Sequence, residues 1–187
     1  MWEVKVKTVY ILCGCPSSGK SFYCNELMQK EPGIYKRINN DSLRESLDLG
    51  VFSTSNEKII RSTREFLIKE SLRQGFNILV DNVNASKSNF DDVCKIVQEM
   101  NIDCQVVGKN FYIDLESAIE RDGKRVGNAC VGEGVVKKFW KQVGGKQFEF
   151  AEPRIETFKR NSFQNGRYYA PAVQDETKQK AIICDLD

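Results

Sequence analysis

The segment from Gly14 to Ser21 combines residue types and a spacing that suit phosphate binding. It reads Gly14-Cys15-Pro16-Ser17-Ser18-Gly19-Lys20-Ser21 and satisfies the pattern G-x-x-x-x-G-K-[ST] in full. Glycines allow a loop whose backbone N–H groups point inward around phosphate oxygens. Lys20 then offers a positive charge to the β- and γ-phosphates, and Ser21 offers a hydroxyl to Mg²⁺. The segment therefore predicts a loop that binds ATP, or another nucleoside triphosphate, with Mg²⁺.

A second candidate for the metal is Asp81. It ends the apolar run NILVD, which has the length and composition of a buried strand. In proteins with this kind of phosphate loop, a carboxylate at the C-terminal end of a strand holds the Mg²⁺ shell. The alternative is an ordinary aspartate that caps the loop after the strand.

Transfer of a phosphoryl group needs a base for the acceptor hydroxyl, and the chain contains no histidine. The base is then a carboxylate, a lysine or a perturbed cysteine. Asp41 follows a strand candidate in RINNDSLRES, and Arg44 lies three residues further, on the same helical face. Arg44 is expected to pair with Asp41 or to bind an anionic acceptor. A helix N-cap with a local Asp–Arg ion pair explains the same spacing equally well.

The segment IERDGKRVGN places Arg121 and Arg125 four residues apart. On one helical face, two guanidinium groups repel each other unless an anion such as a phosphate chain lies between them. Gly123 and Gly127 suggest that this segment moves as a lid. A solvated basic face is the alternative interpretation.

The elements that must position these residues alternate between strand and helix. Strands are predicted at 8–13, 34–38 and 77–80 and within 104–113; helices are predicted at 18–30, 41–47, 56–74, 90–100, 115–125 and 135–143. This alternation predicts a parallel sheet with helices on both faces. For the long helix, Thr54-x-x-Glu57 suggests a capping box, and an apolar face is expected from Ile59, Ile60, Thr63, Phe66 and Leu67.

Composition limits the classes of partner. The 187 residues carry a formal net charge of +2, which is too balanced to coat a polyanion non-specifically, so a nucleic-acid partner would be held by a few placed arginines. The seven cysteines form no CxxC pair and are expected to be reduced thiols. We expect a cytoplasmic protein, because neither a membrane-span-length apolar run nor a signal peptide is evident.

The organisation along the chain suggests one domain at 1–160. From about residue 160 to 180 the sequence becomes polar and resembles a linker. Residues 181–184 are apolar and are followed by Asp185-Leu186-Asp187, the D-x-D pattern of haloacid-dehalogenase-type phosphatases. Residues 161–187 are therefore expected to be a linker and the first strand of a truncated phosphatase domain.

Taken in order, these motifs resemble the kinase half of the bacteriophage polynucleotide 5′-kinase/3′-phosphatase family, whose members heal nucleic-acid ends. The matching segments are GCPSSGKS, INNDSLR, VDN, ERDGKR and AIICDLD. The resemblance implies Asp41 as general base and Arg44 as a contact to the acceptor phosphate. It also implies Arg121 and Arg125 as lid contacts to the donor phosphates, and an oligomer in the full-length protein.

The expected fold is thus a P-loop kinase three-layer α/β/α sandwich of the adenylate-kinase type. The expected activity is ATP-dependent transfer of the γ-phosphate to the 5′-hydroxyl end of RNA or DNA, with Lys20, Asp41 and Arg125 in catalytic roles. A small-metabolite kinase is the first alternative. A nucleotide-binding regulator without an acceptor is the second.

Overall fold

The computed structural model describes residues 6–144 and 154–160. Its strands are β1 (Lys7–Cys13), β2 (Tyr35–Ile38), β3 (Asn77–Asp81), β4 (Cys104–Asn110) and β5 (Ile155–Phe158). Its helices are α1 (Lys20–Lys30), α2 (Asn40–Asp48), α3 (Thr54–Arg73), α4 (Lys87–Met100), α5 (Leu115–Gly123) and α6 (Glu133–Gln142), with a short 3₁₀ turn, η1, at Gly127–Ala129. The predicted linker and D-x-D segment at 161–187 lie outside the described residues.

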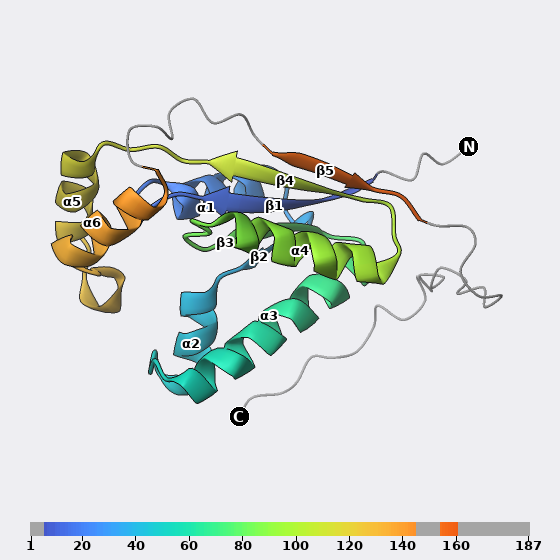
Figure 1. Cartoon of the computed structure of the whole chain (residues 1–187), viewed down its shortest axis with the longest axis horizontal. Helices are drawn as coiled ribbons and strands as arrows, with labels where there is room; N and C mark the ends of the chain where they lie inside the picture. Colours follow the sequence, from blue (N-terminus) through green and yellow to red (C-terminus); the bar gives the residue numbers. More distant parts are fainter. Residues whose placement is uncertain (1–5, 145–153, 161–187) are drawn as a thin grey trace.

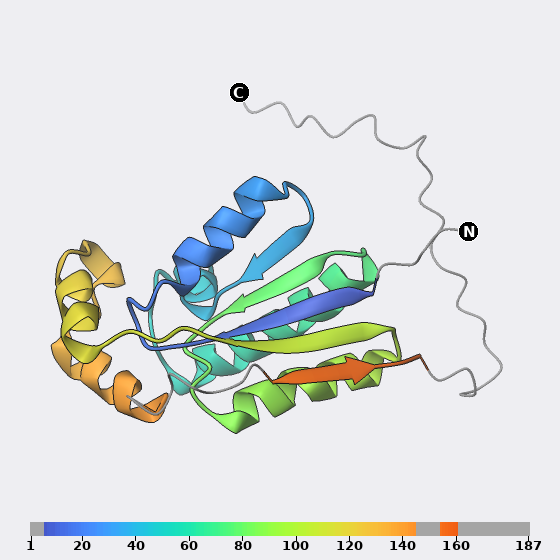
Figure 2. The same ribbon diagram turned by 90° about the horizontal axis from the view of Figure 1, so that it is seen from above.

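The strands form one sheet in the order β2-β3-β1-β4-β5 (Figures 1 and 2). The first four strands are parallel, as the β–α alternation predicts, and the central register pairs Val9 with Ile78 and with Val106. β5 was not predicted. It is antiparallel to β4, with Ile155 opposite Val107 and Phe158 opposite Cys104, and it makes the sheet mostly rather than wholly parallel.

Alternation along β1 divides the core between the two faces of the sheet. Val9 and Ile11 point to the face covered by α3 and α4, where they join a cluster that includes Ile68 of α3 and Val97 of α4. Leu12 points to the opposite face and packs with Cys24 of α1 and Leu79 of β3. The expected three-layer arrangement is therefore confirmed (Figure 1).

A third apolar cluster holds α5 and α6 against the end of the sheet where the parallel strands finish (Figure 2). Its buried members include Ile113, Ala118 and Val136, and Trp140 packs beside them and donates its indole Nε1–H to the Ile113 carbonyl at 2.8 Å. The loops that follow β1, β2 and β3 also lie at this end, because parallel strands bring their carboxyl ends to one edge. The candidate motifs therefore converge there.

One expectation for the long helix is wrong, and another is confirmed only in part. Ser53, not Thr54, is the N-cap of α3, and its hydroxyl accepts the backbone N–H of Asn56 at 3.2 Å. Of the predicted apolar face, Ile60 is buried and Leu67 packs against the core. Ile68 and Leu72 are also buried on this side of α3. Ile59 and Phe66 are 58% and 61% exposed, because they lie on the side of the helix turned away from the sheet.

Two remaining expectations concern cysteines and membranes. Cys13, Cys15, Cys24, Cys94, Cys104 and Cys130 are free thiols, as predicted for the cysteines that the structure describes. Within the described part of the chain, no helix has both the length and the apolar character needed to span a bilayer.

Candidate functional site

The loop between β1 and α1 has a backbone that depends on its glycines. A Cβ on Gly14 would lie 2.6 Å from the Ser18 hydroxyl oxygen and 2.8 Å from the Phe111 carbonyl oxygen, so a side chain has no room there. Gly19, the N-cap of α1, has φ +98°, a left-handed conformation that suits glycine. The loop therefore curls tightly and ends at the N-terminus of α1, where unpaired backbone N–H groups attract an anion.

Lys20 is folded into this loop. Its side-chain ammonium donates to the carbonyl oxygens of Gly14 and Cys15, both at 2.8 Å, and the residue is only 8% exposed. Burial lowers the pKa of Lys20, the negative charge of Asp81 opposes that shift, and the positive charge of Arg125 adds to it. A phosphate chain would add further negative charge beside this buried ammonium.

Ser21 and Asp81 are in direct contact, as expected for two residues that serve one metal. The Ser21 hydroxyl donates to Asp81 Oδ2 at 2.9 Å, and Asp81 is 1% exposed. The same oxygen also accepts Arg37 Nε at 2.9 Å and lies 2.6 Å from Arg37 Nη2. Arg37, on β2, was not singled out from the sequence, because it lies 44 residues away from its partner.

These oxygen atoms suit magnesium. Mg²⁺ is a hard cation that binds through one or two protein oxygens, keeps several waters and contacts substrate phosphates, and the Ser21 hydroxyl beside the Asp81 carboxylate fits that pattern. The described residues hold no cluster of three or more His, Cys, Asp or Glu side chains that would make an all-protein metal cage. The donors therefore fit a metal shared with nucleotide phosphates.

The predicted pairing of Asp41 with Arg44 is present on α2. Arg44 Nη1 donates to Asp41 Oδ1, and the Asp41 side chain is 88% exposed. Arg44 also forms a bidentate ion pair with Glu57 of α3: Nε donates to Oε1 at 2.6 Å and Nη2 donates to Oε2 at 3.1 Å. The Arg44 hydrogen bond lowers the pKa of Glu57, so this carboxylate stays charged. Glu57 is therefore an orienting partner of Arg44 rather than part of a capping box.

Asparagines fix the start of α2 against the end of β3. Asn39 is the N-cap of α2, with its side-chain oxygen accepting the Ser42 backbone N–H at 2.9 Å, and its amide donates to the Asp81 carbonyl. The Asn82 side chain accepts the Asn40 backbone N–H at 2.8 Å. Asp41 therefore occupies the first turn of the helix and is not its cap. This network places Asp41 and Arg44 at the same sheet edge as Ser21 and Asp81.

The lid arginines do not share one helical face, contrary to expectation. α5 ends at Gly123, so Arg125 lies beyond it. The lowered pKa of Lys20 is due first to burial, and the positive charge of Arg125 adds to it. The Arg125 guanidinium Nη1 donates to the Ala129 carbonyl at 3.3 Å and lies 3.9 Å from Asp122 Oδ1, within the segment between α5 and α6.

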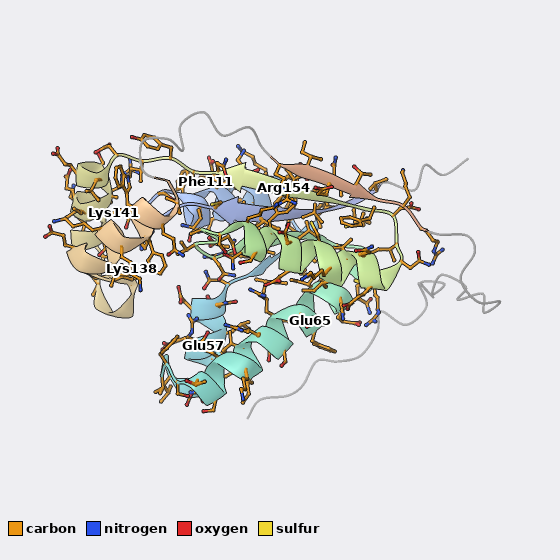
Figure 3. The ribbon with its side chains drawn as sticks, in the orientation of Figure 1. Glu57, Glu65, Phe111, Lys138, Lys141 and Arg154 are labelled. Carbon is orange, nitrogen blue, oxygen red and sulfur yellow. The ribbon has the colours of Figure 1, made fainter. Side chains whose placement is uncertain are left out.

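Figure 3 shows how the remaining charges flank this end of the sheet. Lys138 and Lys141 extend from α6, while Glu57 lies across from them at the beginning of α3. Phe111, labelled in the same view, follows β4, and the Lys109 ammonium lies 5.9 Å from its ring centre. The end of the sheet is thus bordered by α6 with Lys138 and Lys141 on one side and by the linked side chains of Asp41, Arg44 and Glu57 on the other.

Comparison with known proteins identifies the domain. Residues 9–144 match the sequence profile of the AAA_33 family, described as an AAA domain. The chain belongs to this family. The match begins in β1 and ends just after α6, so the AAA_33 domain contains the phosphate loop, the Asp41–Arg44 pair and the helices α5 and α6.

A curated relative is the L-seryl-tRNA(Sec) kinase of Methanococcus maripaludis, 31% identical over 128 residues, or 65% of this chain and 48% of the relative. The structure of the Pnkp1/Rnl/Hen1 RNA repair complex is similar with a TM-score of 0.68 and 22% identity, covering 88% of this chain and 52% of the matched chain. The chain thus spans about half the length of the curated relative and about half the length of the matched chain in the repair complex.

The structure of the Deinococcus radiodurans tunicamycin resistance protein is also similar, with a TM-score of 0.52 and 16% identity over 78% of this chain and 84% of the matched one. At these identities the structural likenesses establish the fold alone. The fold is that of the P-loop kinases, as the sequence predicted.

Proposed function

We propose that this domain transfers the γ-phosphate of ATP to the 5′-hydroxyl end of a polynucleotide, RNA or DNA. The observation that carries the proposal is the placement of Asp41 and Arg44. An exposed carboxylate and a guanidinium held by Glu57 stand at the same sheet edge as the phosphate loop. A base and an anion contact are the two groups that a hydroxyl on a phosphodiester chain requires.

On the acceptor side, Asp41 accepts the proton of the attacking hydroxyl. Its 88% exposure leaves it open to an incoming strand. Arg44 contacts the first phosphate of the strand. Because Arg44 Nε and Nη2 are engaged by Glu57, its orientation is fixed before the acceptor arrives, which reduces the entropic cost of binding.

On the donor side, the backbone N–H groups of the loop and the Lys20 ammonium hold the β- and γ-phosphates. Arg125 reaches from the lid to the transferring group and stabilises its charge. Ser21 and Asp81 are the residues that would hold Mg²⁺, which neutralises phosphate charge when bound.

A second acceptor class has its own support. The curated relative is named as a kinase of L-seryl-tRNA(Sec), and it is 31% identical over 128 residues. A hydroxyl on a small group attached to RNA is therefore the main competitor of a 5′-hydroxyl end. A free metabolite hydroxyl is the other.

The test offers γ-labelled ATP and Mg²⁺ to the protein with four acceptors: a 5′-hydroxyl oligoribonucleotide, the matching oligodeoxyribonucleotide, seryl-tRNA, and a panel of small hydroxyl metabolites. Label on either oligonucleotide, and its absence when the same oligonucleotide carries a 5′-phosphate, is the expected result. Label on seryl-tRNA or a metabolite alone would replace the proposed acceptor while keeping the kinase. ATP binding without transfer to any acceptor would remove the proposal altogether.

A further inference from the structure

Asp122 is a buried carboxylate of the lid that the sequence analysis did not single out. It lies in the last turn of α5 and is 2% exposed. Its Oδ2 accepts the backbone N–H of Gly132 at 2.8 Å, and its Oδ1 lies 3.4 Å from the backbone nitrogen of Val131. The Cys130 thiol also points at Oδ2, at 3.6 Å. The Asp122 side chain, at the end of α5, therefore contacts residues 130–132, which lie directly before α6.

The same carboxylate reaches the phosphate loop. The Ser17 hydroxyl donates to Asp122 Oδ1 at 3.4 Å, across 105 residues of sequence. Ser17 is 5% exposed and has φ +67°, an uncommon conformation for a residue with a side chain. Asp122 is therefore a single acceptor that joins the lid loop to the loop expected to hold the nucleotide.

The loop that Asp122 closes contains Arg125. The Arg125 backbone N–H donates to the Asp122 carbonyl at 3.0 Å, and its guanidinium Nη1 donates to the Ala129 carbonyl at 3.3 Å. Arg125 Nη1 also lies 3.9 Å from Asp122 Oδ1. Each of these contacts joins Arg125 to Asp122 itself or to the segment that Asp122 holds. They position Arg125 within the connection between α5 and α6.

We propose that Asp122 is a positioning residue, which anchors the lid loop to Ser17 so that Arg125 is presented to the transferring phosphoryl group. The proposal rests on phosphoryl transfer from ATP, but it does not depend on which acceptor is used. Asp122 itself does not touch the reacting atoms. Its effect on the reaction passes through Arg125.

The substitution that tests this is Asp122→Asn. Four groups aimed at the carboxylate are donors: the Ser17 hydroxyl, the Cys130 thiol and two backbone N–H groups. An amide of the same size turns one acceptor oxygen into a donor NH₂, so at least one of those groups loses its partner. Glu120→Gln is the matched control, since it removes a carboxylate two residues away on α5 whose contact is an exposed pair with Lys124.

The first readout needs no acceptor. Hydrogen exchange of the Val131 and Gly132 amides is measured with and without Mg²⁺ and ATP. Asp122→Asn should accelerate their exchange about 10–100-fold, because each loses a bond to a charged acceptor. Glu120→Gln should leave that exchange unchanged. Equal exchange in Asp122→Asn and the parent protein would overturn the anchor, whatever the acceptor proves to be.

The second readout is a double-mutant cycle on the rate of phosphoryl transfer to the acceptor that the parent protein uses. Asp122→Asn should lower kcat about 10–100-fold in the parent, and by less than about twofold once Arg125→Ala is present, because the two residues act as one unit. Additive losses would assign Asp122 a purely structural role and overturn the proposal. If Asp122→Asn does not fold, Ser17→Ala makes the milder break and is expected to show the same non-additivity with Arg125→Ala.

Discussion

At the residue scale, the pair Asp41–Arg44 shows which side-chain contacts can be predicted from spacing in the sequence. The three-residue separation predicted their contact, and the contact is present. Local spacing could not supply Glu57, which is 13 residues from Arg44, or Asn82, which lies 42 residues from Asn40. These partners depend on how α2, α3 and β3 meet in space. The sequence therefore predicted the candidate chemical groups but not the residues that orient them.

Asp41→Asn should lower kcat by about 10²–10⁴-fold while leaving ATP affinity nearly unchanged. The reason is that an amide is too weak a base to take the proton of the attacking hydroxyl. Steady-state kinetics with a 5′-hydroxyl oligonucleotide, together with equilibrium ATP binding, measure both quantities. Glu45→Gln, which removes another exposed carboxylate from α2, is the control and should keep normal turnover. A normal kcat for Asp41→Asn would show that this carboxylate is not the base.

Arg44→Ala should raise the KM of a nucleoside 3′-phosphate acceptor and change little with an acceptor that lacks this phosphate. The reason is that a guanidinium held by Glu57 is preset for a phosphate oxygen. Glu57→Gln should give the same pattern in weaker form, since a neutral amide would hold the guanidinium with weaker hydrogen bonds than the carboxylate does. Equal losses with both acceptors would mean that Arg44 acts by orienting Asp41.

At the element scale, the sequence was reliable where a strand or helix carries a strong local signal. β1, α1, β3 and α4 were all expected within about three residues of their observed bounds. The failures have local causes. β5 leaves three of its four residues exposed, so it lacks the apolar run of a buried strand, and α5 was predicted to continue to Arg125, two residues beyond its end at Gly123. After Gly123, the Arg125 backbone N–H donates to the Asp122 carbonyl at 3.0 Å, a turn that no periodic pattern reveals.

The phosphate loop also offers a prediction at this scale. Gly14→Ala should abolish detectable ATP binding or lower the melting temperature by several degrees, because its Cβ would clash with the Ser18 hydroxyl and the Phe111 carbonyl. Gly134→Ala in α6, where a Cβ meets nothing within 4 Å, should be neutral or stabilise by up to about 1 kcal/mol. Thermal melts with and without Mg²⁺ and ATP compare the two. Similar behaviour of both variants would contradict a loop that depends on close backbone packing.

At the scale of the whole molecule, the balance of 28 basic and 26 acidic residues bears on how a strand is held. A general basic surface would give a steep dependence of binding on salt. Here two of the arginines are individually placed, Arg44 by Glu57 and Arg125 by the Ala129 carbonyl. The balanced composition predicts that a nucleic acid would be held by a few placed arginines, and this stays a prediction.

The oligonucleotide KM should therefore change weakly with salt, with a logarithmic slope of about 1–1.5, since each phosphate contact to a single strand contributes about 0.7. Measuring KM over a series of KCl concentrations tests this, and Arg44→Ala should reduce the slope by about 0.7. A slope of about 5 would instead indicate an extended basic track.

The antiparallel direction of β5 determines where a label or a tether can be attached to this domain. Phe158 of β5 and Lys7 of β1 are both level with Cys104, so the described chain enters and leaves the sheet at the same edge. The phosphate loop begins at the other end of β1, seven residues and roughly 20 Å away. A fluorophore or a surface tether attached near Lys7 or Phe158 would therefore lie at the opposite end of the parallel strands from the phosphate loop.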